Sequence, residues 1–240
     1  MDTLQNQKTY NFIEGEVLLI NKPATWTSFD VVNKIRGMLK YFLKARKLKV
    51  GHAGTLDPLA TGLLIICTGK ATKSIQQYQE LDKEYSGTLC LGATTPSLDK
   101  ETDISERFPT EHITEEMIRE ASIAFTGQID QIPPVFSAIK IEGRRAYIMA
   151  RGKQEVPMGP RRVLVSSFDI TGIQMPYVHF RVSCSKGTYI RSLVRDFAES
   201  FGSGAYLDDL CRIRIGDYKL SDAMEIADLE KILKAGQQSV

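Results

Sequence analysis

The sequence predicts an α+β fold with a mixed, mainly antiparallel sheet that is flanked by helices and loops. Strand-like and helix-like segments both occur, and they do not follow the regular strand–helix alternation of a parallel α/β protein. The 240 residues include 42% hydrophobic and 25% charged residues, which are ordinary values for a globular protein. Disordered and collagen-like classes are therefore excluded, and we expect a single domain over residues 1–240.

The first expected elements are a strand and a basic amphipathic helix. Residues 15–22 (GEVLLINK) form a mostly apolar run that ends at Pro23, as expected of a buried strand. Thr27, followed three residues later by Asp30, resembles a capping box, so a helix should begin there and run to about Lys44. The apolar residues of this helix recur at helical spacing: Val31, Ile35, Met38 and Phe42.

The later elements are expected from the same kinds of signal. Residues 63–67 form either a strand or a buried helical segment, because so short an apolar run does not distinguish the two. Helices are expected over Thr114–Phe125 and over Tyr189–Phe201, where Gly202 ends the second. Leu207–Leu210 predicts another short helix. Four further segments predict strands: Glu84–Leu91, Val163–Ile170, Val178–Ser183 and Arg212–Tyr218.

The formal net charge of +2 hides an uneven distribution of charge. Residues 31–56 contain seven Lys or Arg and no Asp or Glu, and residues 136–162 contain seven against two. A third basic group lies near the end: Lys186, Arg191, Arg195, Arg212 and Arg214. Eight acidic residues gather in 97–120. Separate basic and acidic segments favour a polyanion as partner, although one basic run alone is also typical of a solvated helix face.

The cysteines and histidines are scattered along the chain: Cys67, Cys90, Cys184, Cys211, His52, His112 and His179. Because no two cysteines have C-x-x-C spacing, the sequence predicts neither a metal site nor a disulfide framework, and it fits the reducing cytoplasm. No apolar run approaches the roughly 20 residues that a membrane span needs. Residues 1–15 lack the apolar core of an export signal, so we expect no membrane association.

The segment Gly51–Leu64 (GHAGTLDPLATGLL) is the densest candidate for chemistry. Its glycines allow sharp turns or the close approach of a ligand, and Pro58 biases Asp57 towards an extended backbone. A carboxylate held on such a loop beside His52 suits a nucleophile or a general base. The plainer alternative is an Asx turn at Asp57 with structural glycines.

The neighbouring segment Gly69–Thr72 resembles the end of a nucleotide-binding P-loop. That motif needs a glycine five residues before its Gly-Lys pair and a Ser or Thr directly after the lysine. Leu64 and Ala71 occupy these positions, and the sequence contains neither a G-x-S-x-G elbow nor an H-E-x-x-H helix. A nucleotide hydrolase is therefore not supported.

The loop Gly51–Leu64 resembles the catalytic motif of the TruB-type tRNA pseudouridine synthases, which isomerise a uridine in the T-loop of tRNA. Four other stretches are similar to family motifs in the same order: GEVLLINKPATWTSFDVV, ATKSIQQYQELDKEYSGTLCLG, QIPPVFSAIKIEGRRAYIMAR and CSKGTYIRSLVRDFAESFGSGAYLDDLCRIRIG. Together the five motifs extend over about residues 15–218. A lone GTLDP would be a weak signal, whereas five motifs in order are very specific.

The resemblance implies the pseudouridine synthase fold, with a thumb insertion over about residues 132–160 that grips RNA. It implies a tRNA pseudouridine(55) synthase that flips the T-loop uridine out, breaks its N-glycosidic bond and rebonds the base through carbon, without metal or other cofactor. The partner would be tRNA without a guide RNA, and we expect a cytoplasmic monomer. Because only about twenty residues follow Tyr218, we expect no C-terminal RNA-binding module of the PUA type.

Three residues match catalytic positions of the family: Asp57, Tyr85 and Arg191. Asp57 would be the essential carboxylate, which attacks the base, attacks the sugar or withdraws a sugar proton in a glycal route. Arg191 would pair with Asp57 and favour its ionised form, and Tyr85 would stack on the flipped uracil. From the residues alone, Arg191 could instead contact a phosphate and Tyr85 could be a core residue of its strand.

Further positions match the substrate-binding and RNA-binding residues of the family. His52 would fill the space that the flipped base leaves, and Tyr189 and Leu210 would line the base pocket, with a structural histidine and core packing as the plainer alternatives. Lys22 and Lys73 would support the site or contact phosphates. The thumb would contact the RNA backbone through four residues: Lys140, Arg144, Arg145 and Arg151.

Two other functions are compatible with parts of the sequence. A guide-RNA-dependent relative that modifies ribosomal RNA would rely on a PUA module and partner proteins. A catalytically silent RNA-binding or tRNA-folding protein would not need Asp57, Tyr85 and Arg191 together. Residues 39–49 are longer and more basic than expected for the family, so they should extend the RNA-binding surface, whereas the acidic segment after Gly92 is expected to be a surface excursion without a catalytic role.

Overall fold

A computed structural model of the protein describes residues 10–137, 139–141, 143–152 and 156–237. The chain divides into two compact units: unit 1 runs to Glu80 and resumes at Asp217, and unit 2 is Leu81–Gly216. That both units belong to one catalytic domain stays a prediction. None of the helices in these described ranges is long and apolar enough to cross a membrane.

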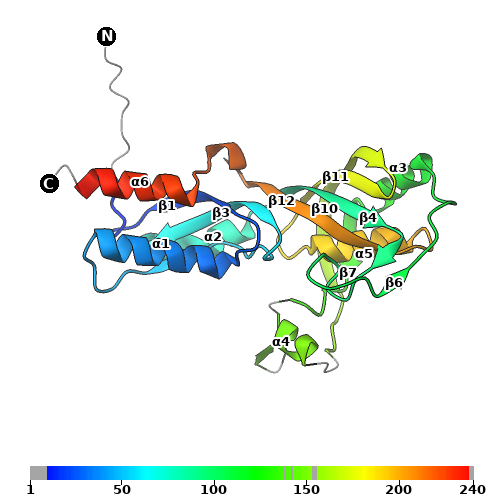
Figure 1. Cartoon of the computed structure of the whole chain (residues 1–240), viewed down its shortest axis with the longest axis horizontal. Helices are drawn as coiled ribbons and strands as arrows, with labels where there is room; N and C mark the ends of the chain where they lie inside the picture. Colours follow the sequence, from blue (N-terminus) through cyan, green and yellow to red (C-terminus); the bar gives the residue numbers. More distant parts are fainter. Residues whose placement is uncertain (1–9, 138, 142, 153–155, 238–240) are drawn as a thin grey trace, which may run out of the picture. The chain divides into compact units, whose positions relative to one another are not determined.

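Unit 1 is a small sheet covered by helices (Figure 1). Its elements are β1 (Val17–Lys22), α1 (Ser28–Phe42), β2 (Val50–His52), β3 (Thr61–Thr68), η1 (Gly69–Ser74), α2 (Ile75–Glu80), β13 (Tyr218–Lys219), η2 (Leu220–Asp222) and α6 (Ile226–Gln237). Strand β3 pairs antiparallel with both β1 and β2. The expected strand over 15–22 is confirmed as β1, and the undecided apolar run 63–67 is part of strand β3.

The core of unit 1 follows from the apolar spacing of α1. Helix α1 turns its buried face towards the sheet and towards α6, which supplies Leu229 and Leu233. The members of this cluster are largely or fully buried: Leu18, Ile20, Val31, Val32, Ile35, Met38, Leu39, Leu64 and Ile66. The sequence prediction of an amphipathic helix here is confirmed, with its end at Phe42 and not at Lys44.

The start of α1 is a capping box, as the sequence predicts. The Thr27 hydroxyl accepts a hydrogen bond from Asp30 N, and the Asp30 carboxylate accepts bonds from the Thr27 backbone N–H and hydroxyl. These bonds lower the pKa of Asp30, the side-chain bond from Thr27 being the main cause. The ionised carboxylate therefore stabilises the fold above its ordinary pKa, and this contribution is lost as the pH falls through the lowered pKa.

Replacing Thr27 with Ala should lower the free energy of unfolding by about 1 kcal/mol, since it removes the side-chain cap from the helix that covers the unit 1 core. Urea denaturation at neutral pH measures this change. The exposed Thr171, in a strand of unit 2, offers a matched Thr→Ala control with little expected effect. Equal losses in the two variants would contradict the capping role.

Unit 2 is built on an antiparallel sheet in the order β12–β4–β11–β10–β7. Its elements are β4 (Lys83–Leu91), β5 (Ala93–Thr94), β6 (Glu106–Arg107), α3 (Glu115–Ala124), β7 (Gly127–Gln131), β8 (Lys140–Ile141), β9 (Arg144–Arg145), α4 (Ala146–Arg151), β10 (Arg161–Gln174), β11 (Tyr177–Cys184), α5 (Ile190–Glu199) and β12 (Ala205–Ile215). The mainly antiparallel α+β fold is thus confirmed.

Helix α5 covers one face of the unit 2 sheet through aromatic contacts. Phe197 packs edge-on against Phe168 of β10 at 5.1 Å between ring centroids, and Phe168 packs against Phe180 of β11 at 5.7 Å. The short helix expected over Leu207–Leu210 is wrong, because these residues belong to the long strand β12. Its register with β4 shifts between Leu207 and Asp209, which is the mark of a β-bulge.

Candidate active site

The Asp57 loop of unit 1 connects β2 to β3. His52 is the last residue of β2, opposite Ile66 of β3. The backbone of Leu56 is held by the buried Ser28, whose hydroxyl accepts from Leu56 N at 2.8 Å and donates to Leu56 O at 3.2 Å. Asp57 O then accepts a bond from Ala60 N at 3.2 Å, which closes a turn around Pro58. This bond uses the backbone carbonyl of Asp57, so it does not test the Asx turn that would form through the side chain, and Asp57 is half-buried.

Glycine is required at both ends of this loop. Gly54 has a φ of +100° and Gly62 a φ of +102°, where a side chain would be strained. The glycines that the sequence analysis noted thus shape the loop that presents Asp57.

Lys22, the last residue of β1, supports the Asp57 loop through a hydrogen bond. It is fully buried at the end of β1, and its ammonium donates to Pro23 O at 2.9 Å, Trp26 O at 2.6 Å and Pro58 O at 3.1 Å. A buried charge held by backbone carbonyls ties the loop to the segment before α1. Of the two roles expected for Lys22, support of the site therefore fits its burial better than a contact with RNA phosphate.

Arg191 lies at the start of α5 and is buried, with only 4% of its side chain exposed. Its Nη1 donates to Ser97 O at 2.9 Å and lies 3.7 Å from Asp99 Oδ2, and its Nη2 donates to Phe136 O at 2.9 Å. The guanidinium is thus fixed in one orientation by charge-assisted bonds. The pairing with Asp57 that the resemblance implies joins residues of two separate units and stays a prediction.

Asp99 is a residue that the sequence analysis missed. Thr95, Ser97 and Asp99 are all buried, so the segment after Gly92 is not wholly the surface excursion that we expected. The hydroxyls of Thr95 and Ser97 donate to Asp99 O at 2.6 and 3.2 Å. Leu98, with a φ of +62°, accepts a bond from Leu207 N of β12 at 2.9 Å, so the turn is anchored to the sheet. No spacing or periodicity in the sequence marks Asp99.

Tyr85, Leu210 and Arg212 share one face of the unit 2 sheet. Tyr85 of β4 lies opposite Arg212 of β12, and Gly87 lies opposite Leu210. Because residues two apart on a strand share a face, Tyr85 and Leu210 are diagonal neighbours. Phe180 lies opposite Gly87 on β11 and belongs to the aromatic cluster with α5, so this is the face that α5 covers. The structure therefore brings two predicted base-pocket residues together. Both are buried, with 8% of Tyr85 and 7% of Leu210 exposed, so their position fits core packing as well as a base pocket.

The third basic group is not a surface group as a whole. Arg212 is only 1% exposed, and Arg191 is similarly buried. These two arginines therefore contribute to the interior of unit 2, and the prediction that they form part of a surface that attracts a polyanion is wrong. Of the same group, Lys186 is exposed.

Tyr189 is positioned by its backbone at the N-cap of α5. The buried Gln131 accepts a bond from Tyr189 N at 2.7 Å and donates to Tyr189 O at 3.0 Å. This pair of bonds fixes the tyrosine two residues before Arg191. Gln131 is a second residue whose positioning role the sequence analysis did not detect.

The expected thumb contains β8, β9 and α4, and β8 pairs antiparallel with β9. Arg144 is exposed. Residues 138, 142 and 153–155 of the expected thumb lie outside the described residues, as do the side chains of Lys140, Arg145 and Arg151. Their contact with the RNA backbone stays a prediction.

The buried cysteines are poor nucleophiles. Burial raises the pKa of both the Cys67 and the Cys184 thiol to about 11, so both are protonated near neutral pH. Within the described ranges, no group of three or more His, Cys, Asp or Glu side chains is arranged to hold a metal ion. The carboxylate of Asp57 is therefore a better candidate for the reacting group than either of these thiols.

Comparison with known proteins gives a family match. Residues 40–190 match the model of the TruB family pseudouridylate synthase (N-terminal domain). The chain is 53% identical over 216 residues to tRNA pseudouridine synthase B of Phocaeicola vulgatus, covering 90% of this chain and 92% of that protein. It is 47% identical over 224 residues to the protein of the same name from Chlorobaculum tepidum, covering 92% of each.

Two solved structures contain chains that are similar to this protein in fold. A chain in the crystal structure of a Cbf5–Nop10–Gar1 complex superposes with a TM-score of 0.69 at 29% identity. A chain in the structure of an H/ACA RNP bound to a substrate RNA containing 2'-deoxyuridine gives 0.68 at 26% identity. The present chain is covered to 92% and 95%, but it spans only 54% and 56% of those two chains.

Proposed function

Because the chain belongs to the TruB family of pseudouridylate synthases, we propose that it converts a uridine in the T-loop of tRNA to pseudouridine. The reaction is an isomerisation. It breaks the N-glycosidic bond of uridine, rotates the base and forms a bond from the sugar to carbon 5 of the same base. The hydrogen of carbon 5 leaves as a proton, and N1, which is released from the sugar, takes up a proton, so atoms and electrons balance without an oxidant or a reductant.

The observation that carries this proposal is the extent of the similarity to curated tRNA pseudouridine synthases. The identity is about half over nine-tenths of the chain, and it holds for relatives from different bacterial groups. The family match contains the Asp57 loop, Tyr85 and the expected thumb. Arg191 and Leu210 follow beyond the matched range, so for them the support is the burial and register described above.

We assign the chemical step to Asp57 and the recognition of the base to unit 2. The half-buried carboxylate acts as nucleophile or base on the uridine, and Lys22 and Ser28 hold its loop. The face with Tyr85 and Leu210 supplies aromatic and aliphatic contact for a flipped base, and such stacking contributes about 1–3 kcal/mol per base. Tyr189 lines the same pocket, and His52 fills the space that the base leaves.

Charge supports this assignment. Arg191 carries a buried cation that Asp99 and two carbonyls keep in place, and a fixed cation favours an ionised carboxylate close to it. The thumb arginines and lysines contact phosphates and contribute salt-dependent affinity without reading sequence. We further propose that the protein acts as a monomer in the cytoplasm, and that it selects its site by the shape of the T-loop.

The proposal includes independence from a guide RNA and from partner proteins, although the solved chains that resemble this protein in fold lie in multi-component complexes. The test is to incubate the purified protein with an unmodified tRNA transcript, without guide RNA or cofactor, and to map pseudouridine along the RNA. Pseudouridine is expected at a T-loop uridine. The matched control is a transcript in which that uridine is replaced by cytidine, for which no product is expected.

The two failures of this experiment have different meanings. No pseudouridine anywhere would overturn the proposed activity on tRNA. Product at uridines outside the T-loop, or product that requires an added guide RNA, would keep the pseudouridine synthase activity but overturn the proposed choice of substrate.

A further inference from the structure

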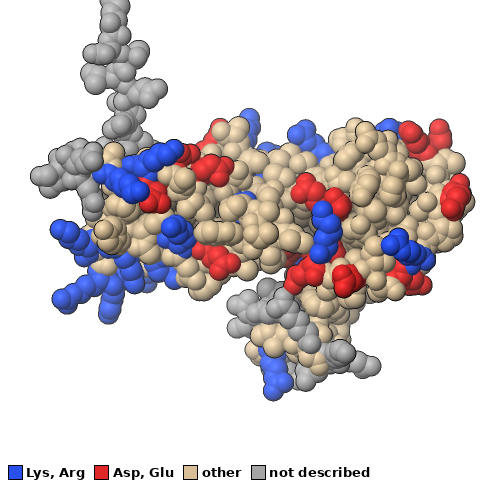
Figure 2. All heavy atoms as spheres, viewed as in Figure 1, with Lys and Arg blue, Asp and Glu red and all other residues tan. Residues whose placement is uncertain are grey.

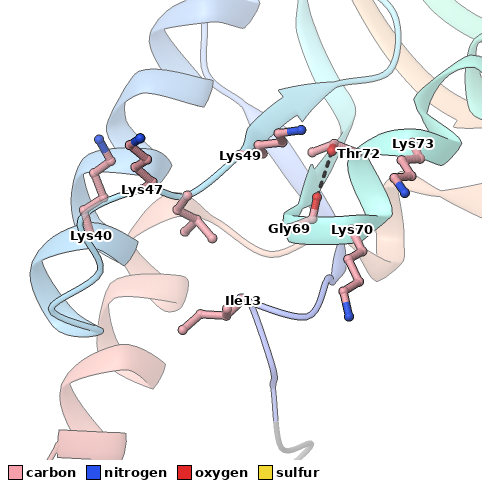
Figure 3. Close-up of a pocket in the computed structure, with 9 residues that line it drawn as sticks. Ile13, Lys40, Lys47, Lys49, Gly69, Lys70, Thr72 and Lys73 are labelled. Atoms are coloured by element: carbon pink, nitrogen blue, oxygen red, sulfur yellow. Dashed lines mark hydrogen bonds between the residues drawn. The ribbon is translucent and has the colours of Figure 1, made fainter.

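A pocket of about 530 Å³ in unit 1 is lined largely by lysines. They come from the end of α1, the loop that follows it and η1: Lys40, Lys47, Lys49, Lys70 and Lys73. Figure 3 shows Lys40 and Lys47 on one side of the pocket and Lys70 and Lys73 on the other. Ile13, Leu48, Gly69 and Thr72 complete the lining. None of these lysines takes part in the chemical step proposed above, whereas the sequence predicts contact with RNA for residues 39–49 and site support or phosphate contact for Lys73.

The backbone holds the lysine-bearing segments together. Gly69 N donates to Lys49 O at 2.9 Å, and Lys70 N donates to Glu14 O at 2.9 Å. Gly69 has a φ of +50°, and a side chain there would collide with the backbone of Ile13 at 2.2 Å. The Thr72 hydroxyl donates to Gly69 O at 2.8 Å, so the segment that resembles a P-loop is instead a closed 3₁₀ turn (Figure 3). The lysines thus project from a fixed frame.

The pocket carries a surplus of positive charge. Lys70 forms an exposed ion pair with Glu14. Across the part of the chain that the structure describes, no carboxylate lies within ion-pair distance of Lys40, Lys47, Lys49 or Lys73. Figure 2 shows basic side chains gathered at the edge of unit 1 where α1 ends. Neighbouring cations without counter-charges repel one another, and a polyanion relieves that repulsion.

The pocket is remote from the reacting loop. Val50 lies opposite Thr68, so Lys49 and Gly69 adjoin the C-terminal end of β3. The Asp57 loop adjoins the other end, where Lys22 lies opposite Gly62 and donates to Pro58 O. The eight residues of β3 span about 23 Å at about 3.3 Å per residue. A group bound in the pocket therefore cannot be the reacting uridine.

We propose that this lysine pocket binds the phosphate backbone of the tRNA at a distance from the modified loop, as a second contact besides the thumb. The inference rests on the proposed function for the identity of the RNA. An RNA backbone fits the pocket better than a small anion does. All five lysines are exposed to solvent, where water and salt screen each single contact, and only a chain of phosphates engages several of them at once.

The test compares two triple Lys→Gln variants of the full chain. The pocket variant carries Lys40→Gln, Lys47→Gln and Lys49→Gln. The control variant carries Lys34→Gln, Lys231→Gln and Lys234→Gln, which removes the same charge from exposed positions of unit 1 that do not line the pocket. Each set removes one lysine from the last turn of a helix, α1 or α6, so helix-dipole effects are matched.

The measurement is the dissociation constant for unmodified tRNA as a function of salt concentration. For the pocket variant we expect binding at least about tenfold weaker near 0.1 M salt, and a log–log salt slope smaller by roughly 2. The control variant should keep the wild-type affinity and slope. Equal behaviour of the two variants, whether both weaken or neither does, would overturn the proposal.

A second experiment distinguishes RNA from a small anion as the ligand of the pocket. Inorganic pyrophosphate should bind the wild-type protein only weakly in the absence of RNA. Tight pyrophosphate binding that the pocket variant loses, with its tRNA affinity unchanged, would assign the pocket to a small anion and overturn the proposal. Failure of the proposed function would be recognised separately, because the wild-type protein would then form no pseudouridine whatever the variants bind.

Discussion

Replacing Asp57 with Asn is expected to lower the turnover number for pseudouridine formation by at least about 10⁴-fold, because the amide neither attacks carbon nor accepts a proton at neutral pH. The change keeps the size and shape of the side chain. The turn at Pro58 and the Ser28 bonds involve the backbone, so the loop should keep its form. Single-turnover assays with excess enzyme measure the chemical step without interference from product release.

Two measurements show whether the loss is chemical. The Asn variant should bind tRNA as the wild type does, and it should unfold at the same urea concentration. The exposed Asp103 offers a matched Asp→Asn control in unit 2, with unchanged turnover expected. An Asp57→Asn enzyme that turns over normally would remove Asp57 from the mechanism.

Replacing Asp99 with Asn should lower the turnover number by roughly 10- to 100-fold, the equivalent of about 1.5–3 kcal/mol for a lost hydrogen bond or ion pair to a charged group. Asp99 does not reach the substrate in our account. The Asp99 carboxylate neutralises the charge of the buried Arg191. Of the Arg191 partners described above, only the neutral carbonyls of Ser97 and Phe136 would remain without Asp99. The cation would then be held less firmly where the carboxylate needs it.

The control for Asp99 is Asp208, whose carboxylate lies 3.1 Å from Lys100 Nζ in a partly exposed pair. Asp208→Asn removes the same charge from the same unit and should change turnover little, because ion pairs that solvent reaches contribute little. The loss in Asp99→Asn should appear in the turnover number more than in KM. A loss confined to stability, with normal turnover of the folded fraction, would make Asp99 a structural residue only.

The elements with strong periodicity were predictable from the sequence. Thr27 and Asp30 marked the start of α1, and the spacing of its apolar residues fixed its buried face. Alternation identified β4, and the helix α3 began after its Thr114 cap as expected. In each case the local sequence pattern and the tertiary packing favour the same secondary structure.

The failures have equally local causes. Leu207 and Leu210 are three residues apart and both buried, which is typical of a helix, but a β-bulge in β12 produces the same spacing in a strand. Helix α6 was missed, although Ile226, Leu229 and Leu233 recur at helical spacing and the last two are buried.

The candidate active site also contains residues that could be predicted from the sequence and residues that could not. Asp57, Tyr85 and Arg191 were selected through the resemblance to the TruB family, because five short motifs in order can be recognised without a fold. The partners that hold these groups could not be predicted. Asp99 acts through a buried ion pair and Gln131 through hydrogen bonds, in both cases with residues more than fifty positions away, and neither leaves a pattern in the sequence. Only the folded chain reveals them.

The most direct test of the account uses tRNA that carries tritium at carbon 5 of its uridines. Rebonding the base through that carbon must release its hydrogen to water. With the wild-type protein alone, we expect one equivalent of tritium per tRNA to be released to water. This release should disappear when the T-loop uridine is replaced by cytidine, and the Asp57→Asn variant should show no comparable release. Absence of release by the wild type, or equal release by the variant, would contradict the account.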